Sequence, residues 1–544
     1  MKSKIRRTEC LKATLLFLLF FVALLTHAQN LTLVSDCYTG HSYPSELTEF
    51  NNKIYFIARS KNSAGYYRLF SSDGVLASTS QVGLLDANPY NVSNLVKTDN
   101  YLFFSYNDGV HGEEIWKSDG TAAGTSMIKD INVGNAGADG STPGYLTVCN
   151  NKVFFIAYAP QVSLWVTDGT EAGTIQLVAH PYVHTLNSNT KLAVLNNEVY
   201  FNSGDNTTAG LYKSDGTVAG TTFVKSCVSN TSVATLPQGF AELNNVLYFT
   251  AEGRLSNGAS DGSSYEIWRT DGTSAGTYIV KDVNPTGGSF PDRYFAFNNK
   301  LYFTATGSQS QGEELWATDG TGAGTYLVKD IIPGSTSSYI RNFINYGQLY
   351  FFITNGNHRE IWKTDGTEAG TQLVAVGQHI ANEDKNTIYN GKIYFFGENF
   401  SDAYLYSFDG TLISKIMPQV NSYSGAQSIY GSQNFLEFNN DLYFRAFYDY
   451  SDLEVCKITM PATSGNANLE SNKTILLHPN PSNGIFSIDT DKSINAIAAF
   501  DVLGKAIGVN RLSANQFSIE NKGLYFLKIE FENGQTGSSR IIIK

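Results

Sequence analysis

Residues 314–325 read ELWATDGTGAGT, and this phrase recurs along the chain. All five tryptophans stand three residues before an Asp-Gly pair in a copy of it: Trp116, Trp165, Trp268, Trp316 and Trp362. The heptad Asp-Gly-Thr-x-Ala-Gly-Thr is intact six times, starting at Asp119, Asp168, Asp215, Asp271, Asp319 and Asp365, and is degenerate at Asp73 and Asp409. A phrase that recurs in register predicts an array of one structural unit.

A second anchor, Asn-Asn-x-hydrophobic-Tyr-Phe, marks the same unit. It recurs nine times, in strict or looser form, around Ile54, Leu102, Val153, Val199, Leu247, Leu301, Leu349, Ile393 and Leu442. The copies lie about 44 to 54 residues apart. This spacing is typical of propeller blades.

Each unit is predicted to contain four short strands, exemplified by residues 46–50, 300–305, 314–318 and 326–331. Asn-Asn and Asp-Gly separate these strands, and both pairs favour tight hairpin turns because they tolerate positive φ. The pattern therefore indicates a four-stranded antiparallel meander in each unit.

The third strand predicts that both faces of each sheet are buried. Leu315 and Trp316 are neighbours, so they point to opposite faces, and both are large and apolar. We therefore expect an all-β fold, a closed β-propeller of four-stranded blades. Nine blades follow from the count, and eight blades with one irregular unit is the alternative.

The two ends of the repeat region are expected to meet in one blade. Residues 31–36 resemble a fourth strand, whereas the ninth unit stops after its third strand, residues 453–458. The N-terminal strand would complete the last blade and remove an open sheet edge. A Cys37–Cys456 disulfide would staple this closure in an exported protein, and two buried free thiols are the alternative. Cys149 and Cys227 are expected to be free.

Residues 1–28 are predicted to be a signal peptide. Lys2, Lys4, Arg6 and Arg7 precede an apolar run over residues 15–25, and small residues at 26 and 28 favour cleavage before Gln29. No other long apolar run follows, so we expect no transmembrane segment in the mature chain. Cleavage would leave 33 basic against 48 acidic residues, which moves the net charge from −11 to −15. Such an acidic chain is a poor candidate for nucleic-acid binding.

The Thr-Asp-Gly-Thr turns resemble the ELWxxDGT repeat of secreted bacterial proteins. The resemblance covers about residues 31–458, and the whole propeller is predicted to span residues 29–459. It implies an extracellular repeat protein.

The pattern changes after the repeats. Residues 460–473 are interpreted as a polar linker, and residues 474–544 as a small immunoglobulin-like β-sandwich. The order of Pro-Asn-Pro-Ser-Asn-Gly (479–484), Gly504-Lys505 and Gly523-Leu524-Tyr525 resembles the type A C-terminal sorting domain of the type IX secretion system. This resemblance implies the type IX machinery as a partner of residues 474–544, and a secreted or cell-surface protein of a Gram-negative bacterium.

The recurring polar residues are better explained by folding than by chemistry, because an active site is asymmetric. Each turn aspartate is expected to bond its own loop. Calcium is the alternative, with Asp130, Asp282 and Asp330 as further ligands. Phe70, Tyr212, Tyr406 and Cys456 replace the tryptophan in other units, which favours packing between blades over sugar stacking.

No residue is therefore assigned a catalytic, cofactor-binding or metal-binding role. Glu113-Glu114 and Glu313-Glu314 are adjacent, so their side chains should point apart. His180 and His184 are separated by Pro181, which argues against a helix that would align them.

The leading hypothesis is a non-catalytic scaffold that binds an unknown surface protein or glycan. Three insertions are candidate binding loops, residues 107–112, 204–209 and 252–264. The alternatives are a polysaccharide hydrolase or lyase, which would gather unlike titratable residues at one mouth of the channel, and a purely structural matrix component.

Overall fold

The computed structural model describes residues 30–544 except for 64, 84–90, 134–139, 180–191, 204–209, 228–236, 253–264, 309, 356–357, 378–385, 400–401, 417–434, 448–452, 460–475, 479–481, 491–492, 502–504 and 532–535. The chain divides into two compact units, residues 1–460 and 461–544. The predicted signal peptide (1–28), the linker (460–473) and the pair His180 and His184 lie outside the described residues. Within the described part of the chain, no helix has the length and apolarity needed to cross a membrane.

Nine four-stranded antiparallel sheets make up the described part of the first unit. The first four sheets comprise β2 Ser45–Phe50, β3 Lys53–Arg59, β4 Tyr67–Ser72 and β5 Ser80–Gln81; β6 Val92–Lys97, β7 Leu102–Asn107, β8 Glu113–Ser118 and β9 Ser126–Lys129; β10 Gly144–Cys149, β11 Lys152–Tyr158, β12 Val162–Thr167 and β13 Ile175–Ala179; β14 Ala193–Leu195, β15 Glu198–Ser203, β16 Gly210–Ser214 and β17 Thr222–Lys225. Two short 3-10 helices, Lys61–Ser63 and Leu76–Ser78, belong to the first sheet's loops.

The next four sheets repeat the same meander. They comprise β18 Gln238–Leu243, β19 Val246–Glu252, β20 Tyr265–Thr270 and β21 Tyr278–Lys281; β22 Asp292–Phe297, β23 Lys300–Ser308, β24 Gln311–Thr318 and β25 Tyr326–Lys329; β26 Arg341–Asn345, β27 Leu349–Asn355, β28 His358–Thr364 and β29 Gln372–Gly377; β30 Asn386–Tyr389, β31 Lys392–Asn399, β32 Asp402–Phe408 and β33 Ile413–Ile416. The ninth contains β34 Leu436–Phe438, β35 Asp441–Phe447 and β36 Leu453–Thr459.

The start of the chain completes the ninth sheet. Strand β1, Asn30–Leu33, pairs antiparallel with β36 and sets Leu33 opposite Cys456. The prediction that the N-terminus supplies the missing fourth strand is therefore confirmed.

The turns between first and second strands have the predicted left-handed backbone. Asn51 and Asn52 have φ of 48° and 57°, and the Asn-Asn pairs at 150–151, 196–197, 244–245, 298–299 and 439–440 match them. Two successive positive φ values are the signature of a type I′ hairpin turn, which explains why asparagine recurs here.

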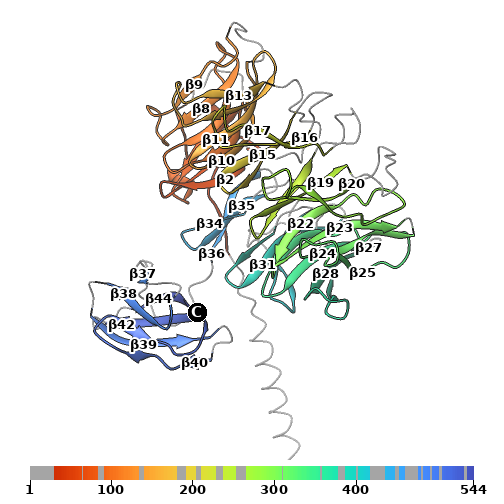
Figure 1. Ribbon diagram of the computed structural model, residues 1–544. Helices are drawn as coiled ribbons and strands as arrows, with labels where there is room; N and C mark the ends of the chain where they lie inside the picture. Colours follow the sequence, from red (N-terminus) through yellow and green to blue (C-terminus); the bar gives the residue numbers. More distant parts are fainter. Residues whose placement is uncertain are drawn as a thin grey trace, which may run out of the picture. The chain divides into compact units, whose positions relative to one another are not determined.

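Buried apolar side chains join each sheet to the next. Nine clusters in the described residues link successive sheets, and one of these clusters links the ninth sheet to the first through Val455 and Phe56. Leu315 belongs to the cluster between sheets six and seven, and Trp316 to the cluster between sheets five and six. The prediction of two apolar faces is confirmed, and Figure 1 shows β34–β36 beside β2.

The meander gives the first unit two sides that carry different loops. One side carries the Asn-Asn turns and the Asp-Gly turns, and we call it the turn face. The opposite side carries the loops between second and third strands and the connections from one sheet to the next, and we call it the connection face. All three candidate binding insertions lie between a second and a third strand in the chain order.

The second unit contains two four-stranded sheets within its described residues. One sheet has the order β37 Leu476–His478, β38 Ile485–Asp489, β42 Gln516–Ser518 and β41 Asn510–Arg511. The other has the order β40 Ala506–Ile507, β39 Ile494–Phe500, β43 Gly523–Phe531 and β44 Thr536–Ile543. Residues of both sheets, including Phe486, Phe517 and Leu527, share one apolar core.

The predicted Cys37–Cys456 disulfide is wrong. Both cysteines are free and buried. Cys37 packs in the cluster between the ninth and first sheets, whereas Cys456 packs between the eighth and ninth. The two thiols therefore lie on opposite faces of the ninth sheet, which sequence alignment of the strands alone does not reveal. Cys149 and Cys227 are also free, as expected.

We expect thiol titration to find these four cysteines reduced. Burial raises the pKa of Cys227 to about 12 and raises those of Cys37 and Cys456 as well, so little thiolate is available at neutral pH. In a non-reducing assay on the mature chain, all four should react in denaturant and almost none in native buffer. A melting temperature that drops when reductant is added would contradict this prediction.

Candidate functional site

The Asp-Gly turns on the turn face are closed hydrogen-bond networks. Asp319 Oδ1 accepts bonds from the Thr321 N–H (2.9 Å) and hydroxyl (2.7 Å), and Thr321 Oγ1 accepts from the Gly324 N–H (2.9 Å). The Thr325 hydroxyl donates to the Thr321 carbonyl (2.7 Å). These bonds lower the pKa of Asp319, the Thr321 hydroxyl contributing most. The same geometry holds at Asp119, Asp168, Asp215, Asp271 and Asp365. The predicted role of these aspartates in their own loops is confirmed.

The glycine of each turn receives a side chain from the preceding sheet. A Cβ on Gly320 would lie 2.1 Å from the Tyr248 hydroxyl, and one on Gly272 would lie 2.4 Å from that of Tyr200. The tyrosine belongs to the Asn-Asn-x-x-Tyr-Phe anchor of one unit and the glycine to the Asp-Gly anchor of the next. The two anchors of the sequence therefore form one contact between neighbouring sheets.

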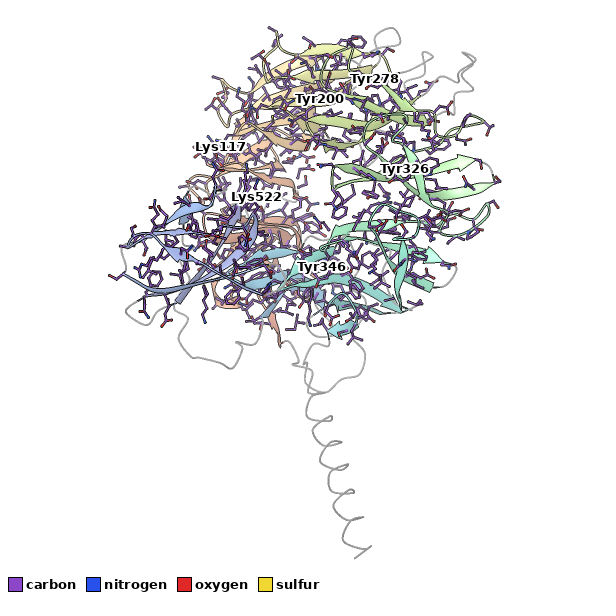
Figure 2. All side chains as sticks on the ribbon, turned by 60° about the horizontal axis from the view of Figure 1, so that its bottom comes forward. Lys117, Tyr200, Tyr278, Tyr326, Tyr346 and Lys522 are labelled. Atoms are coloured by element: carbon purple, nitrogen blue, oxygen red, sulfur yellow. The ribbon has the colours of Figure 1, made fainter. Side chains whose placement is uncertain are left out.

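Further polar contacts on the turn face reinforce the junctions. The Lys117 ammonium donates to the Gly169 carbonyl (2.7 Å), and the Tyr326 hydroxyl donates to the Gly366 carbonyl (2.7 Å). Figure 2 labels Lys117 and four tyrosines of this unit, and they follow one another around it in chain order: Tyr200, Tyr278, Tyr326 and Tyr346. The turn face is thus occupied by contacts that hold sheets together.

The tryptophan row packs between sheets, as predicted. Each of the nine clusters contains one residue of this position: Phe70, Trp116, Trp165, Tyr212, Trp268, Trp316, Trp362, Tyr406 and Cys456. Trp268 stacks on Phe249 with ring centroids 6.2 Å apart. The row is therefore a packing element.

A buried glutamate two residues before the tryptophan position is a feature that the sequence analysis missed. Glu266 accepts bonds from the Val283 N–H (2.9 Å), at the exit of its own sheet, and from the Ser289 hydroxyl (2.6 Å), at the entry to the next. Glu114 does the same with Ile131 and Ser141. The signal was present, because Glu recurs at 114, 266, 314, 360 and 454 and Ser at 42, 141, 289 and 338.

These carboxylates are strongly perturbed. Burial raises the pKa of Glu266, Glu314 and Glu454 to about 7, against an ordinary value of 4.5. The adjacent acids Asp282, Asp330 and Asp36 raise it further. Carboxyls with a shifted pKa often mark active sites. Here they recur at the same position of several units, and each bonds the junction between two sheets.

The adjacent carboxylates point apart, as predicted. Glu114 is buried at its junction, whereas Glu113 accepts a bond from the Ser93 hydroxyl (3.3 Å). Glu313 instead belongs to a group of unlike charges on the connection face. Its pKa is raised by burial and by Asp292, and Arg341 opposes that shift.

Four residues enter the first strand of a sheet with left-handed backbone. Tyr43, Thr142, Phe290 and Tyr339 have φ of 46°, 45°, 48° and 47°. Bulky residues rarely adopt this conformation. Half of the Phe290 and Tyr339 side-chain surfaces is exposed, so the connection face presents aromatic rings.

Of the three candidate insertions, only residues 107–112 are described throughout. Asp108 Oδ2 lies 2.6 Å from His111 Nδ1, which raises the pKa of His111. Residues 204–209 and 253–264 lie outside the described residues.

The potential metal ligands in the described part of the chain do not cluster. The described residues contain no group of three His, Cys, Asp or Glu side chains that could hold a metal ion. Asp130, Asp282 and Asp330 are described, and each has one buried carboxylate oxygen without a hydrogen-bond partner in the described protein. They lie after the fourth strands, away from the Asp-Gly turns, so the two sets do not form one calcium site.

The sheets define the class of the protein. Nine successive four-stranded antiparallel sheets in the described residues, packed face to face in chain order, give an all-β, propeller-like fold. Residues 476–544 match the family model of the secretion system C-terminal sorting domain. The chain therefore carries a type IX sorting domain, which implies interaction with the secretion machinery and a secreted or cell-surface protein of the Bacteroidetes group. No curated protein matches the chain.

Several solved structures resemble the chain at a distance. BamB from Moraxella catarrhalis is 12% identical, with a TM-score of 0.37, over 67% of this chain and 96% of that one. The β-propeller domain of the Trilobed protease from Pyrococcus furiosus is 11% identical, with a TM-score of 0.35, over 70% and 100%. A structure from a study of two prolyl endopeptidases is 11% identical, with a TM-score of 0.38. The match covers 70% of this chain and 50% of that one. These likenesses are too distant to carry a statement on activity.

Proposed function

We propose that residues 29–459 form a closed nine-bladed propeller of the ELWxxDGT type that acts as a non-catalytic binding scaffold after type IX export. The pairing of β1 with β36 and the cluster between the ninth and first sheets support closure. The shared core of the two C-terminal sheets supports an immunoglobulin-like sandwich for residues 474–544. The ligand is a surface protein or a glycan.

One observation carries the non-catalytic role: the recurring polar groups are used in folding contacts. Each turn aspartate bonds its own threonine, and Glu114 and Glu266 bond the serine of the next sheet. Catalysis would require unlike groups that are available to a substrate. The connection face instead exposes the aromatic side chains of Phe290 and Tyr339. Exposed aromatic rings are suited to ligand recognition.

A polysaccharide hydrolase or lyase is the second candidate, and one group of residues favours it. The group consists of unlike charges on the connection face: Asp292 and Arg293 on the first strand of the sixth sheet, Glu313 on its third strand, and Arg341 on the first strand of the seventh sheet. Glu313, with its raised pKa, would be the general acid.

Incubation of the mature protein with insoluble and soluble polysaccharides separates the two candidates. We expect retention of the protein on at least one polysaccharide or on the bacterial surface, with no release of reducing ends or unsaturated sugars. Glu313→Gln should release no sugar either. Sugar release that Glu313→Gln abolishes would replace the binding role by the enzymatic one.

A further inference from the structure

The connection face holds aromatic residues in a strained backbone. Phe290 and Tyr339 stand at the same position of the sixth and seventh sheets, which pack side by side, with φ of 48° and 47°. Left-handed backbone is unfavourable for any residue with a Cβ, so it persists only where the surroundings impose it.

The preceding serine imposes this conformation. The Ser289 N–H donates to the Tyr265 carbonyl (3.0 Å), its hydroxyl donates to Glu266 (2.6 Å), and its carbonyl accepts from the Thr306 N–H (2.8 Å). The Phe290 N–H donates to the same Tyr265 carbonyl (3.1 Å). Every polar group of Ser289 is thus engaged, and Phe290 is fixed where the chain leaves the junction.

The seventh sheet repeats the arrangement. The Ser338 N–H and hydroxyl both donate to the Glu313 carbonyl, at 2.9 and 2.8 Å, and its carbonyl accepts from the Thr354 N–H (3.3 Å). Tyr339 follows in the left-handed conformation with half of its surface exposed. The two rings are therefore presented to solvent from rigid positions.

The packing of the rings is too slight to offset the cost of this backbone conformation. The Phe290 ring is half exposed and makes a tilted contact with Tyr265, 5.5 Å between centroids. A glycine would meet the backbone requirement without strain. The left-handed backbone recurs at Thr142, which has no ring, so the strain belongs to the serine junction. Phe290 and Tyr339 add a half-exposed ring to this fixed backbone, and exposed aromatic rings held in this way are suited to recognition.

The surroundings of the rings indicate the chemistry of the ligand. Arg293 lies 3.5 Å from Asp292, and Glu313 experiences the charge of Arg341, so two cations balance two carboxylates. Such a surface offers donors and acceptors without net charge. The mature chain is strongly acidic, which disfavours a polyanionic ligand.

We propose that Tyr265, Phe290 and Tyr339 form a binding site for a neutral oligosaccharide, the rings stacking on the apolar faces of the sugars and the neighbouring charged groups bonding their hydroxyls. This inference rests on the proposed binding function and narrows it to one ligand class and one place.

Glycine substitutions test the site on the full mature chain. The probes are neutral tetra- to hexasaccharides of glucose, xylose and mannose, measured by calorimetry. Phe290→Gly and Tyr339→Gly should each weaken binding by about tenfold or more while raising the melting temperature. Thr142→Gly is the matched control, because Thr142 has the same left-handed conformation and its N–H bonds the Glu113 carbonyl (3.0 Å), but it carries no ring. It should raise the melting temperature and leave binding unchanged.

The outcomes separate this site from the proposed function. Saccharide binding that survives both ring deletions overturns the site and leaves the scaffold function standing. A wild-type chain that binds a protein on the bacterial surface, but none of these saccharides, overturns the ligand class alone. A melting temperature that falls in Phe290→Gly, but rises in Thr142→Gly, would make the ring a packing element and overturn the site as well.

Discussion

Replacement of Gly320 by alanine is expected to cost about 4 kcal/mol of unfolding free energy, far more than one added methyl usually costs. The new Cβ would lie 2.1 Å from the hydroxyl of Tyr248, which is buried between the fifth and sixth sheets. It would also force a residue with a Cβ to φ of 94°. The tyrosine cannot retreat, because its ring belongs to the packed cluster.

Two variants separate the steric effect from the backbone effect. Gly334→Ala is the matched control, since Gly334 has φ of 107° and nothing within 4 Å of its would-be Cβ, so it should lose only about 1–2 kcal/mol. Tyr248→Phe in the Gly320→Ala background should recover about half of the loss. The chain supports this rescue, because where Phe103 and Phe154 replace the tyrosine, the Cβ positions at Gly169 and Gly216 are 3.3 and 3.2 Å away. Equal losses in urea unfolding of Gly320→Ala and Gly334→Ala would refute the contact.

The sequence predicted the unit well because its signals are local. Asn-Asn turns, alternation at Leu315 and Trp316 and the closing strand all follow from backbone preferences and strand periodicity, and the structure confirms them. The substitution pattern of the tryptophan row was sufficient to predict packing, because Phe, Tyr and Cys can share a buried position but not a stacking role.

The junctions between units could not be predicted in the same way. The contact of Tyr248 with Gly320 joins two anchors that belong to different units, and nothing local specifies which turn a side chain reaches. The disulfide prediction failed for the same reason, since strand alignment does not say which face of the ninth sheet Cys37 covers. The left-handed rings of Phe290 and Tyr339 were also missed, because residues after a serine and before a strand carry no strong conformational preference.

The stability of the propeller-like unit is expected to decrease as pH rises from 5.5 to 8. Burial raises the pKa of Glu266, Glu314 and Glu454 to about 7 in the folded chain, whereas an ordinary Glu titrates at 4.5. The folded state therefore holds these protons more tightly than the unfolded state. Their stabilisation is complete below pH 4.5 and is lost as pH rises through about 7. Since each pKa unit is worth about 1.4 kcal/mol, the loss between pH 5.5 and 8 should be about 2 kcal/mol for each carboxyl and about 6 kcal/mol for the three.

The acid side of the profile has a different origin. The pKa values of the turn aspartates, such as Asp319, are lowered by their threonine bonds, so their contribution is lost as pH falls below the ordinary value of 3.8. The two effects together predict a stability maximum near pH 4, between the ordinary pKa values of Asp and Glu, unlike the plateau that a surface of unperturbed carboxylates would give.

Glutamine substitutions test the assignment to the buried glutamates. The triple variant Glu266→Gln, Glu314→Gln, Glu454→Gln keeps side-chain size and an acceptor oxygen but cannot titrate, so its unfolding free energy should change little between pH 5.5 and 8. Glu313→Gln is the control, because Glu313 is next to Glu314 in sequence yet makes no junction bond through its side chain among the described contacts. Its profile should keep most of the wild-type slope. A wild-type profile that is flat or rising over this range would contradict the prediction. It would mean that the hydrogen-bond donors around these carboxylates, four of them at Glu114, lower the pKa by more than burial raises it.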